Sequence, residues 1–91
     1  MAMIAAWIKV EDERLPQSLQ AAGERLDNVD GEVVLDFSSV RRIDASDLRA
    51  LEDLVKRADE KGVKVGLRGV NVNVYKVFKL VNLASRFSFV N

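Results

Sequence analysis

The 91-residue chain contains no cysteine and no histidine. Without cysteine it forms no disulfide and offers no thiol nucleophile, and without either residue the usual zinc sites are excluded. The same absences remove Ser-His-Asp and Cys-His catalysis from the isolated chain. The phosphate-binding patterns GxxxxGK(S/T) and GxGxxG are absent as well. We therefore predict a chain that is not an enzyme and that carries no cofactor or metal ion.

An excess of charge of one sign is also missing, because 14 basic residues balance 14 acidic ones. A general nucleic-acid binder normally carries a basic excess, so we expect no nucleic-acid partner. No stretch approaches the roughly 18 consecutive apolar residues of a membrane span. The N-terminal MAMIAAWIKV lacks the basic region of a signal peptide. These absences predict a cytoplasmic protein without membrane insertion.

The balanced charge is unevenly distributed along the chain. Residues 1–45 hold 5 basic and 9 acidic groups, whereas residues 46–91 hold 9 basic and 5 acidic groups. Ordinary variation of a solvated surface is the simpler interpretation. The other interpretation is a polarised surface that orients a partner.

The apolar pattern predicts a single α/β domain over residues 1–91. Apolar residues at steps of three and four indicate helices, and short runs rich in β-branched residues indicate strands. Strands joined through helices imply a mostly parallel sheet with right-handed crossovers. One run is nearly continuous, which is typical of a central strand covered on both faces. The predicted strands are residues 4–10, 32–37 (the central one), 63–68 and 87–90, and the predicted helices are about residues 15–26, 45–61 and 71–82.

Aromatic and basic residues fall together on the third predicted helix. Phe78 has the spacing of a core residue, and with Tyr75 it also forms a candidate aromatic patch for a partner. Lys76 and Lys79 are most simply a solvated face. Trp7, in the first predicted strand, is expected to pack in the core or at its rim.

The stretch RRIDASDLRAL, residues 41–51, places one serine between two aspartates at the start of the longest predicted helix. Asp44 and Asp47 are three apart, and two close carboxylates can share a proton or bind a hard cation. A helix N-terminus also stabilises acidic groups through its free N–H groups and its dipole. We favour the second interpretation, with Asp44 as the cap and Asp47 completing a capping box.

Ser46 lies within the first turn of that helix, where its hydroxyl is near the surface and near unpaired N–H groups. A phosphate on this hydroxyl would gain from the helix dipole, but it would also crowd Asp44 and Asp47. A change of about two charges on a surface can eject a partner without unfolding the domain. Simple capping is the other interpretation of the same serine, and the chemistry alone favours it.

Two motifs resemble the signature of STAS domains, the family of the bacterial anti-sigma factor antagonists. The first is VVLDFSSV at residues 33–40, and the second is IDASDL at residues 43–48. The likeness covers about residues 31–90 and extends to the whole chain through the order of elements. It implies an α/β fold in which a mixed, mostly parallel sheet of four or five strands packs with three or more helices.

The resemblance also implies a regulatory function. An antagonist of this type binds an anti-sigma factor that is also an ATP-dependent serine kinase, and it is released when the kinase phosphorylates it. A phosphatase then resets the system. Ser46 falls at the phosphorylated position, Asp44 matches the aspartate of that motif, and Asp36 matches the aspartate that ends the preceding strand. The resemblance therefore implies partner binding through Asp36, Asp44, Ser46 and Asp47.

The chain departs from the family pattern at three informative positions. Ala45 replaces the first serine of the motif, Asp47 replaces the glycine after the phosphorylated serine, and Asn82 stands where glycine is usual. Asp47 adds charge and bulk where a kinase must approach. It motivates an alternative function, in which the chain is an unphosphorylated STAS subunit of an ABC-type lipid transporter or of a sensory complex. The partner in that case is a transporter ATPase.

Overall fold

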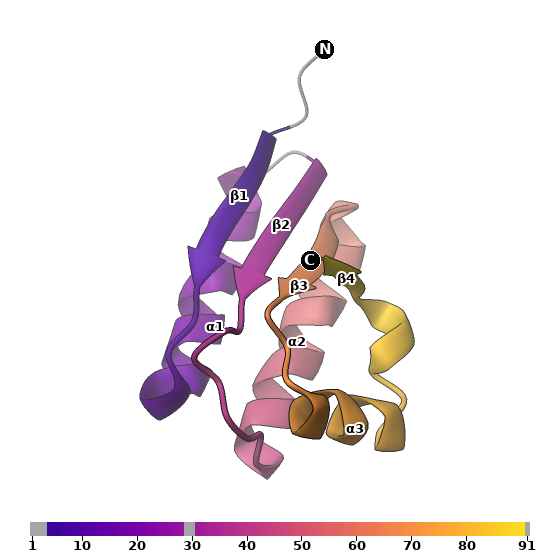
Figure 1. Ribbon diagram of the computed structural model, residues 1–91. Helices are drawn as coiled ribbons and strands as arrows, with labels where there is room; N and C mark the ends of the chain where they lie inside the picture. Colours follow the sequence, from indigo (N-terminus) through magenta and orange to yellow (C-terminus); the bar gives the residue numbers. More distant parts are fainter. Residues whose placement is uncertain (1–3, 29–30, 91) are drawn as a thin grey trace.

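The computed structural model describes residues 4–28 and 31–90, and it confirms the predicted alternation of strands and helices (Figure 1). Each observed boundary lies within two residues of the predicted one. None of the helices in these two ranges is long and apolar enough to cross a membrane. The elements are β1 (Ile4–Lys9), α1 (Leu15–Arg25), β2 (Gly31–Asp36), α2 (Ala45–Lys61), β3 (Lys64–Arg68), α3 (Val72–Leu80) and β4 (Ser88–Val90).

The four strands form one sheet in the order β1-β2-β3-β4, and every neighbouring pair is parallel. Each crossover therefore moves to the next strand in the same direction. Because such crossovers are right-handed, the connecting helices lie on the same side. Figure 1 shows α1 and α2 behind the sheet, and α3 beyond the end of β3. Within the described residues, no helix covers the other face.

The central strand β2 is nevertheless buried on both faces. Val34 points to the helix-free face, yet it is only 6% exposed. It pairs with Trp7 of β1 and Gly66 of β3, and the guanidinium carbon of Arg68 lies 5.4 Å from the centroid of the Trp7 ring. Side chains of the neighbouring strands thus cover Val34, whereas Trp7 itself remains 55% exposed at the rim.

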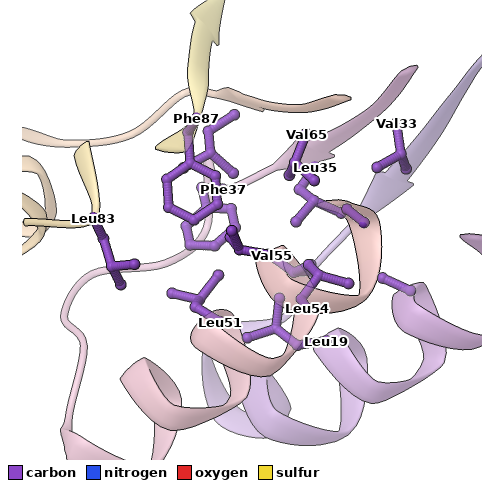
Figure 2. Packing of buried hydrophobic residues seen from close by; sticks show 14 of the residues in the cluster. Leu19, Val33, Leu35, Phe37, Leu51, Leu54, Val55, Val65, Leu83 and Phe87 are labelled. Carbon is purple, nitrogen blue, oxygen red and sulfur yellow. The ribbon is translucent and has the colours of Figure 1, made fainter. Parts of the chain in front are cut away.

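The core lies between the sheet and the helices (Figure 2). Leu19 of α1, Leu51 and Leu54 of α2 and Leu35 of β2 are all buried in it. An aromatic row continues the core toward α3 and β4. Phe37 meets Phe78 edge-on at 6.3 Å between ring centroids, and Phe78 meets Phe87 at 5.5 Å. Phe78 is therefore a core residue, as its spacing predicts.

The C-terminal end of α3 explains why the chain carries asparagine where the family usually has glycine. Asn82 has a φ of 63°, in the left-handed region. The N–H of Leu83 then donates to the carbonyl of Phe78 at 2.8 Å, which closes the helix. Glycine does the same at the end of α2, where Gly62 has a φ of 69°. Asparagine is among the few other residues that adopt this conformation readily.

Candidate functional site

The N-terminus of α2 is closed by a reciprocal pair of hydrogen bonds. The N–H of Asp47 donates to Oδ1 of Asp44 at 2.9 Å, and the N–H of Asp44 donates to Oδ2 of Asp47 at 3.0 Å. The hydroxyl of Ser46 also donates to Oδ1 of Asp44, at 2.8 Å. This geometry confirms the predicted capping box. Three of the four predicted site residues therefore belong to one hydrogen-bonded group.

The two carboxylates of this cap lie in different surroundings. Asp44 is exposed, whereas Asp47 is only 7% exposed because its side chain turns back into the cap. The hydrogen bond from the Asp47 N–H lowers the pKa of Asp44. Burial raises the pKa of Asp47, against the opposing hydrogen bond from the Asp44 N–H. The outer carboxylate thus keeps its negative charge more readily than the inner one.

The geometry of the cap argues against a cation site at Asp44 and Asp47. Their facing oxygen atoms already accept backbone N–H groups. Over residues 4–28 and 31–90, no group of three or more acidic side chains is placed to hold a metal ion. The aspartates therefore serve the helix start.

Ser46 is exposed and lies next to a groove between α1 and α2. The groove has a volume of about 650 Å³, and its charged lining comes from α2. Arg57 lies close above α1 because Gly23 has no side chain there; a Cβ at Gly23 would come within 2.7 Å of Arg57 Nη1. The groove residues with charged or hydroxyl groups are Ser46, Arg49, Asp53, Lys56, Arg57 and Glu60.

Asp36, the fourth predicted site residue, lies apart from this cap at the end of β2. Its Oδ1 accepts the N–H of Ser38 at 2.9 Å. Hydrogen bonding from Ser38 lowers the pKa of Asp36, with a smaller effect from the cations Arg68 and Lys9 that flank it in the sheet. Among the described residues it shares no hydrogen bond with the α2 cap. Asp36 therefore shapes the turn that leads away from β2.

Asn71 is the residue that the sequence reasoning missed. Its Oδ1 accepts the N–H of Val74 at 2.8 Å and so caps α3. Its Nδ2 donates to the carbonyls of Val40 and Arg41, at 3.1 and 3.2 Å. One side chain thus starts α3 and also holds the segment that leads into α2. The available signal was an asparagine directly before helically spaced valines, a common N-cap pattern.

The same segment is held from its other side by residues around the end of β1. The hydroxyl of Ser39 donates to the carbonyl of Val10 at 3.0 Å, and the N–H of Arg41 donates to Oδ1 of Asp12 at 3.2 Å. With Asn71 on the opposite side, the connection between β2 and α2 is fixed to both neighbouring connections. The exposed first turn of α2 therefore has a defined position on the molecule.

The fold agrees with what comparison with known proteins shows. A family model described as "Mlab, STAS domain" matches residues 11–90. The chain belongs to this STAS family. The Intermembrane phospholipid transport system binding protein MlaB of Escherichia coli is 41% identical over 59 residues, and the Shigella flexneri protein of that name matches equally. The match covers 65% of this chain and 61% of each relative, so it spans less than two thirds of their length.

Solved structures share the fold at low sequence identity. The crystal structure of a candidate anti-sigma factor antagonist from Thermotoga maritima superposes with a TM-score of 0.77 at 18% identity, over 99% of this chain and 83% of that one. A sulfate transporter family protein from Wolinella succinogenes gives 0.80 at 15% identity, over 98% and 80%. These likenesses confirm the predicted STAS-type α/β fold.

Proposed function

We propose that this STAS domain is a non-enzymatic, cytoplasmic binding subunit of an ATP-driven lipid transport system. In this proposal the exposed first turn of α2 contacts the ATP-binding subunit of the transporter. The observation that carries the proposal is the family match over residues 11–90, together with 41% identity to a protein named for phospholipid transport. This function is the alternative that Asp47 motivates in the sequence.

The chemistry of the α2 cap supports a binding role. The proton of the Ser46 hydroxyl is used in the bond to Asp44, so the oxygen lone pairs of Ser46 are what remains for a partner. The exposed Asp44 carboxylate lies beside them. Such a surface suits a partner that presents N–H donors or a basic side chain. Its rigid attachment lowers the entropy that binding must overcome.

Co-purification with the transporter ATPase tests the proposal. Ala45 is exposed in the first turn, so Ala45→Arg adds bulk and charge without removing any side-chain hydrogen bond. We expect it to reduce recovery of the ATPase at least about tenfold. The matched control is Ala21→Arg, at an exposed position of α1 that does not line the groove. Equal recovery with both variants would count against binding through α2.

Phosphorylation control of an anti-sigma factor remains a second candidate because of the position of Asp47. Its side chain is turned inward, so it does not obstruct access to the exposed Ser46 hydroxyl. A phosphate there would replace the 2.8 Å bond to Asp44 with repulsion between two anions. Incubation with ATP and the cognate serine kinase tests this candidate, with Ser46→Ala as the control.

The two candidates give opposite results for Ser46. Phosphate on the wild type but not on Ser46→Ala supports the anti-sigma switch. Undiminished recovery of a transporter ATPase with Ser46→Ala, and no phosphate on the wild type, supports the transport subunit.

A further inference from the structure

Exposed apolar side chains gather on one side of the domain. The described residues include seven large apolar side chains that are exposed, and six of them lie on or next to α3 and β4. Leu80 is 82% exposed and Val72 is 66% exposed. Four of the six line one groove, and a cluster of exposed apolar side chains often marks an interaction site. The six residues, which we call the α3–β4 surface, are Val72, Tyr75, Leu80, Val81, Phe89 and Val90.

The helix α3 has two apolar faces rather than one. Val74 and Phe78 point into the core and are buried. A second row follows the outward face at steps of three and four, and it combines apolar residues with lysines. An amphipathic helix on the surface of a domain normally turns a polar face to water. The outward row of α3 consists of Val72, Tyr75, Lys76, Lys79 and Leu80.

A groove of about 530 Å³ adjoins this row at the ends of β3 and β4. Tyr75 and Phe89 form part of its wall and meet edge-on at 5.1 Å between ring centroids. The strand β4, which carries Phe89 and Val90, is an edge of the sheet. An edge strand offers backbone N–H and carbonyl groups to an added extended segment. The groove therefore combines an apolar hollow with backbone partners.

The charge of this part of the chain is of one sign. Arg68 lines the groove, and Lys79 Nζ lies 5.9 Å from the centroid of the Tyr75 ring. Residues 61–91 contain six basic residues and no acidic residue. The charged residue that lines the groove is Arg68, and Lys76 and Lys79 extend the positive charge along the exposed side of α3, so this surface favours acidic groups. The basic residues are Lys61, Lys64, Arg68, Lys76, Lys79 and Arg86.

We infer that the α3–β4 surface binds an extended segment of a protein partner that is both acidic and apolar. Its apolar side chains fill the groove beside the Tyr75–Phe89 pair, its carboxylates pair with Arg68, Lys76 and Lys79, and its backbone runs beside β4. This site is separate from the first turn of α2, and the inference holds whether or not the α2 site binds a transporter ATPase.

A protein segment fits this surface better than a lipid bilayer does. The helix α3 has nine residues and is about 13 Å long, which is short for a helix that binds a membrane interface through its buried area. The hollow beside it is concave, as sites for peptide side chains are, whereas a bilayer requires a protruding face.

Selection of random twelve-residue peptides displayed on phage tests the inference. We expect the wild-type protein to enrich peptides that combine at least two acidic residues with aromatic or branched apolar ones. A synthetic copy of the most enriched peptide should bind the double variant Lys76→Glu/Lys79→Glu at least about tenfold more weakly. Its binding to the wild type should also weaken as salt is added.

The matched control is Lys56→Glu/Lys64→Glu, which makes the same charge change at exposed lysines of α2 and β3. It should bind the peptide as the wild type does, and circular dichroism should show that both variants are folded. Equal weakening in the two variants, or enrichment without acidic residues, would overturn the inference.

Two further measurements test whether a lipid surface or a second copy of the chain occupies this surface instead. Co-sedimentation with vesicles of phosphatidylcholine and phosphatidylglycerol, lost in Lys76→Glu/Lys79→Glu, would replace the peptide by a lipid surface. Sedimentation equilibrium that shows a wild-type dimer, dissociated by the same two substitutions, would replace it by a second copy of the chain. A wild-type protein that remains monomeric and does not bind these vesicles supports the inference.

Discussion

The helix α2 continues the connection that leaves β2, and α3 begins beside that connection. Each helix satisfies its free N–H groups with a different side chain. Asp44 starts α2 with a carboxylate that accepts from the Asp47 N–H and the Ser46 hydroxyl. Asn71 starts α3 with an amide that accepts from Val74 and also donates to two carbonyls of that connection. The first cap is acidic and local, whereas the second is neutral and connects distant parts of the chain.

This difference separates two kinds of surface on one small domain. The carboxylate cap leaves a negative charge and a hydroxyl at the exposed start of α2. The amide cap of Asn71 adds no negative charge to α3, so the positive charge of Lys76 and Lys79 is not neutralised by the cap. A partner can therefore recognise the two helix starts by opposite chemistry, although they lie next to one segment of the chain.

The largest expected effect is a loss of stability when the Asn71 amide, which connects α3 to the connection between β2 and α2, is removed. Asn71→Ala removes one cap and two donors, so we expect a loss of about 2 kcal/mol in the free energy of unfolding. Asn71→Ser retains a capping oxygen but cannot reach both carbonyls, and it should cost about 1 kcal/mol. Urea unfolding measures both variants. A cost near zero for Asn71→Ser would show that the donated bonds contribute nothing.

Removal of the carboxylate cap should have a smaller, local effect. Asp44→Ala loses the bonds from Asp47 and Ser46, and we expect the Tm to fall by about 5 °C. Asp44→Asn keeps a capping oxygen and should lower it by less than half as much. Thermal unfolding followed by circular dichroism compares the two. A larger loss with asparagine than with alanine would contradict the capping role.

The opposite pKa shifts of the two aspartates predict opposite pH dependence. Asp44 has a lowered pKa in the folded state. Its contribution to the free energy of unfolding is therefore present above its unfolded pKa and is lost as the pH falls through the folded pKa. Asp47 has a raised pKa in the folded state. Its contribution to the free energy of unfolding is therefore present below its unfolded pKa and is lost as the pH rises through the folded pKa.

Unfolding of Asp44→Asn and Asp47→Asn between about pH 3 and pH 7 measures this contrast. Relative to the wild type, Asp44→Asn should become less stable as the pH rises, whereas Asp47→Asn should become more stable. Parallel pH profiles for the two variants would mean that the carboxylates share one environment.

The smallest expected effect is that of Asn82→Gly, at the C-terminal end of α3. Asn82 takes a left-handed conformation at the end of α3, where Gly62 does so for α2. Asn82→Gly should change the free energy of unfolding by less than about 0.5 kcal/mol, because both residues accept this conformation. Asn82→Ala should cost about 1 kcal/mol. Chemical unfolding measures the pair, and a harmless alanine would show that the conformation is not required.

Much of the fold could be predicted because its signals are local. The spacing of apolar residues in α1 and α2 gave their buried faces, and Asp44 with Asp47 gave the capping box. The end of α3 was predicted at residue 82 because Val81 continues the helical spacing. The left-handed φ of Asn82 ends the helix earlier, at Leu80.

What the sequence could not reveal depends on contacts between distant residues. Asn71 reaches carbonyls 30 and 31 positions away, which only the folded arrangement brings within range. The run in β2 predicted coverage on both faces, but not that Trp7 and Arg68 would supply it on one face. Asp47 looked like an obstacle beside Ser46, although its predicted place in the capping box already implies a side chain that turns back toward the Asp44 N–H.

Photo-crosslinking in the source cell shows whether the first turn of α2 contacts a transporter ATPase. p-Benzoylphenylalanine in place of Ala45 puts a reactive group on the first turn of α2, and the same group in place of Ala21 serves as the control on α1. We predict that position 45, and not position 21, crosslinks to the ATP-binding subunit of a transporter, identified by mass spectrometry. A crosslink from position 45 to a serine kinase instead, or equal crosslinking of the ATPase from both positions, would contradict it.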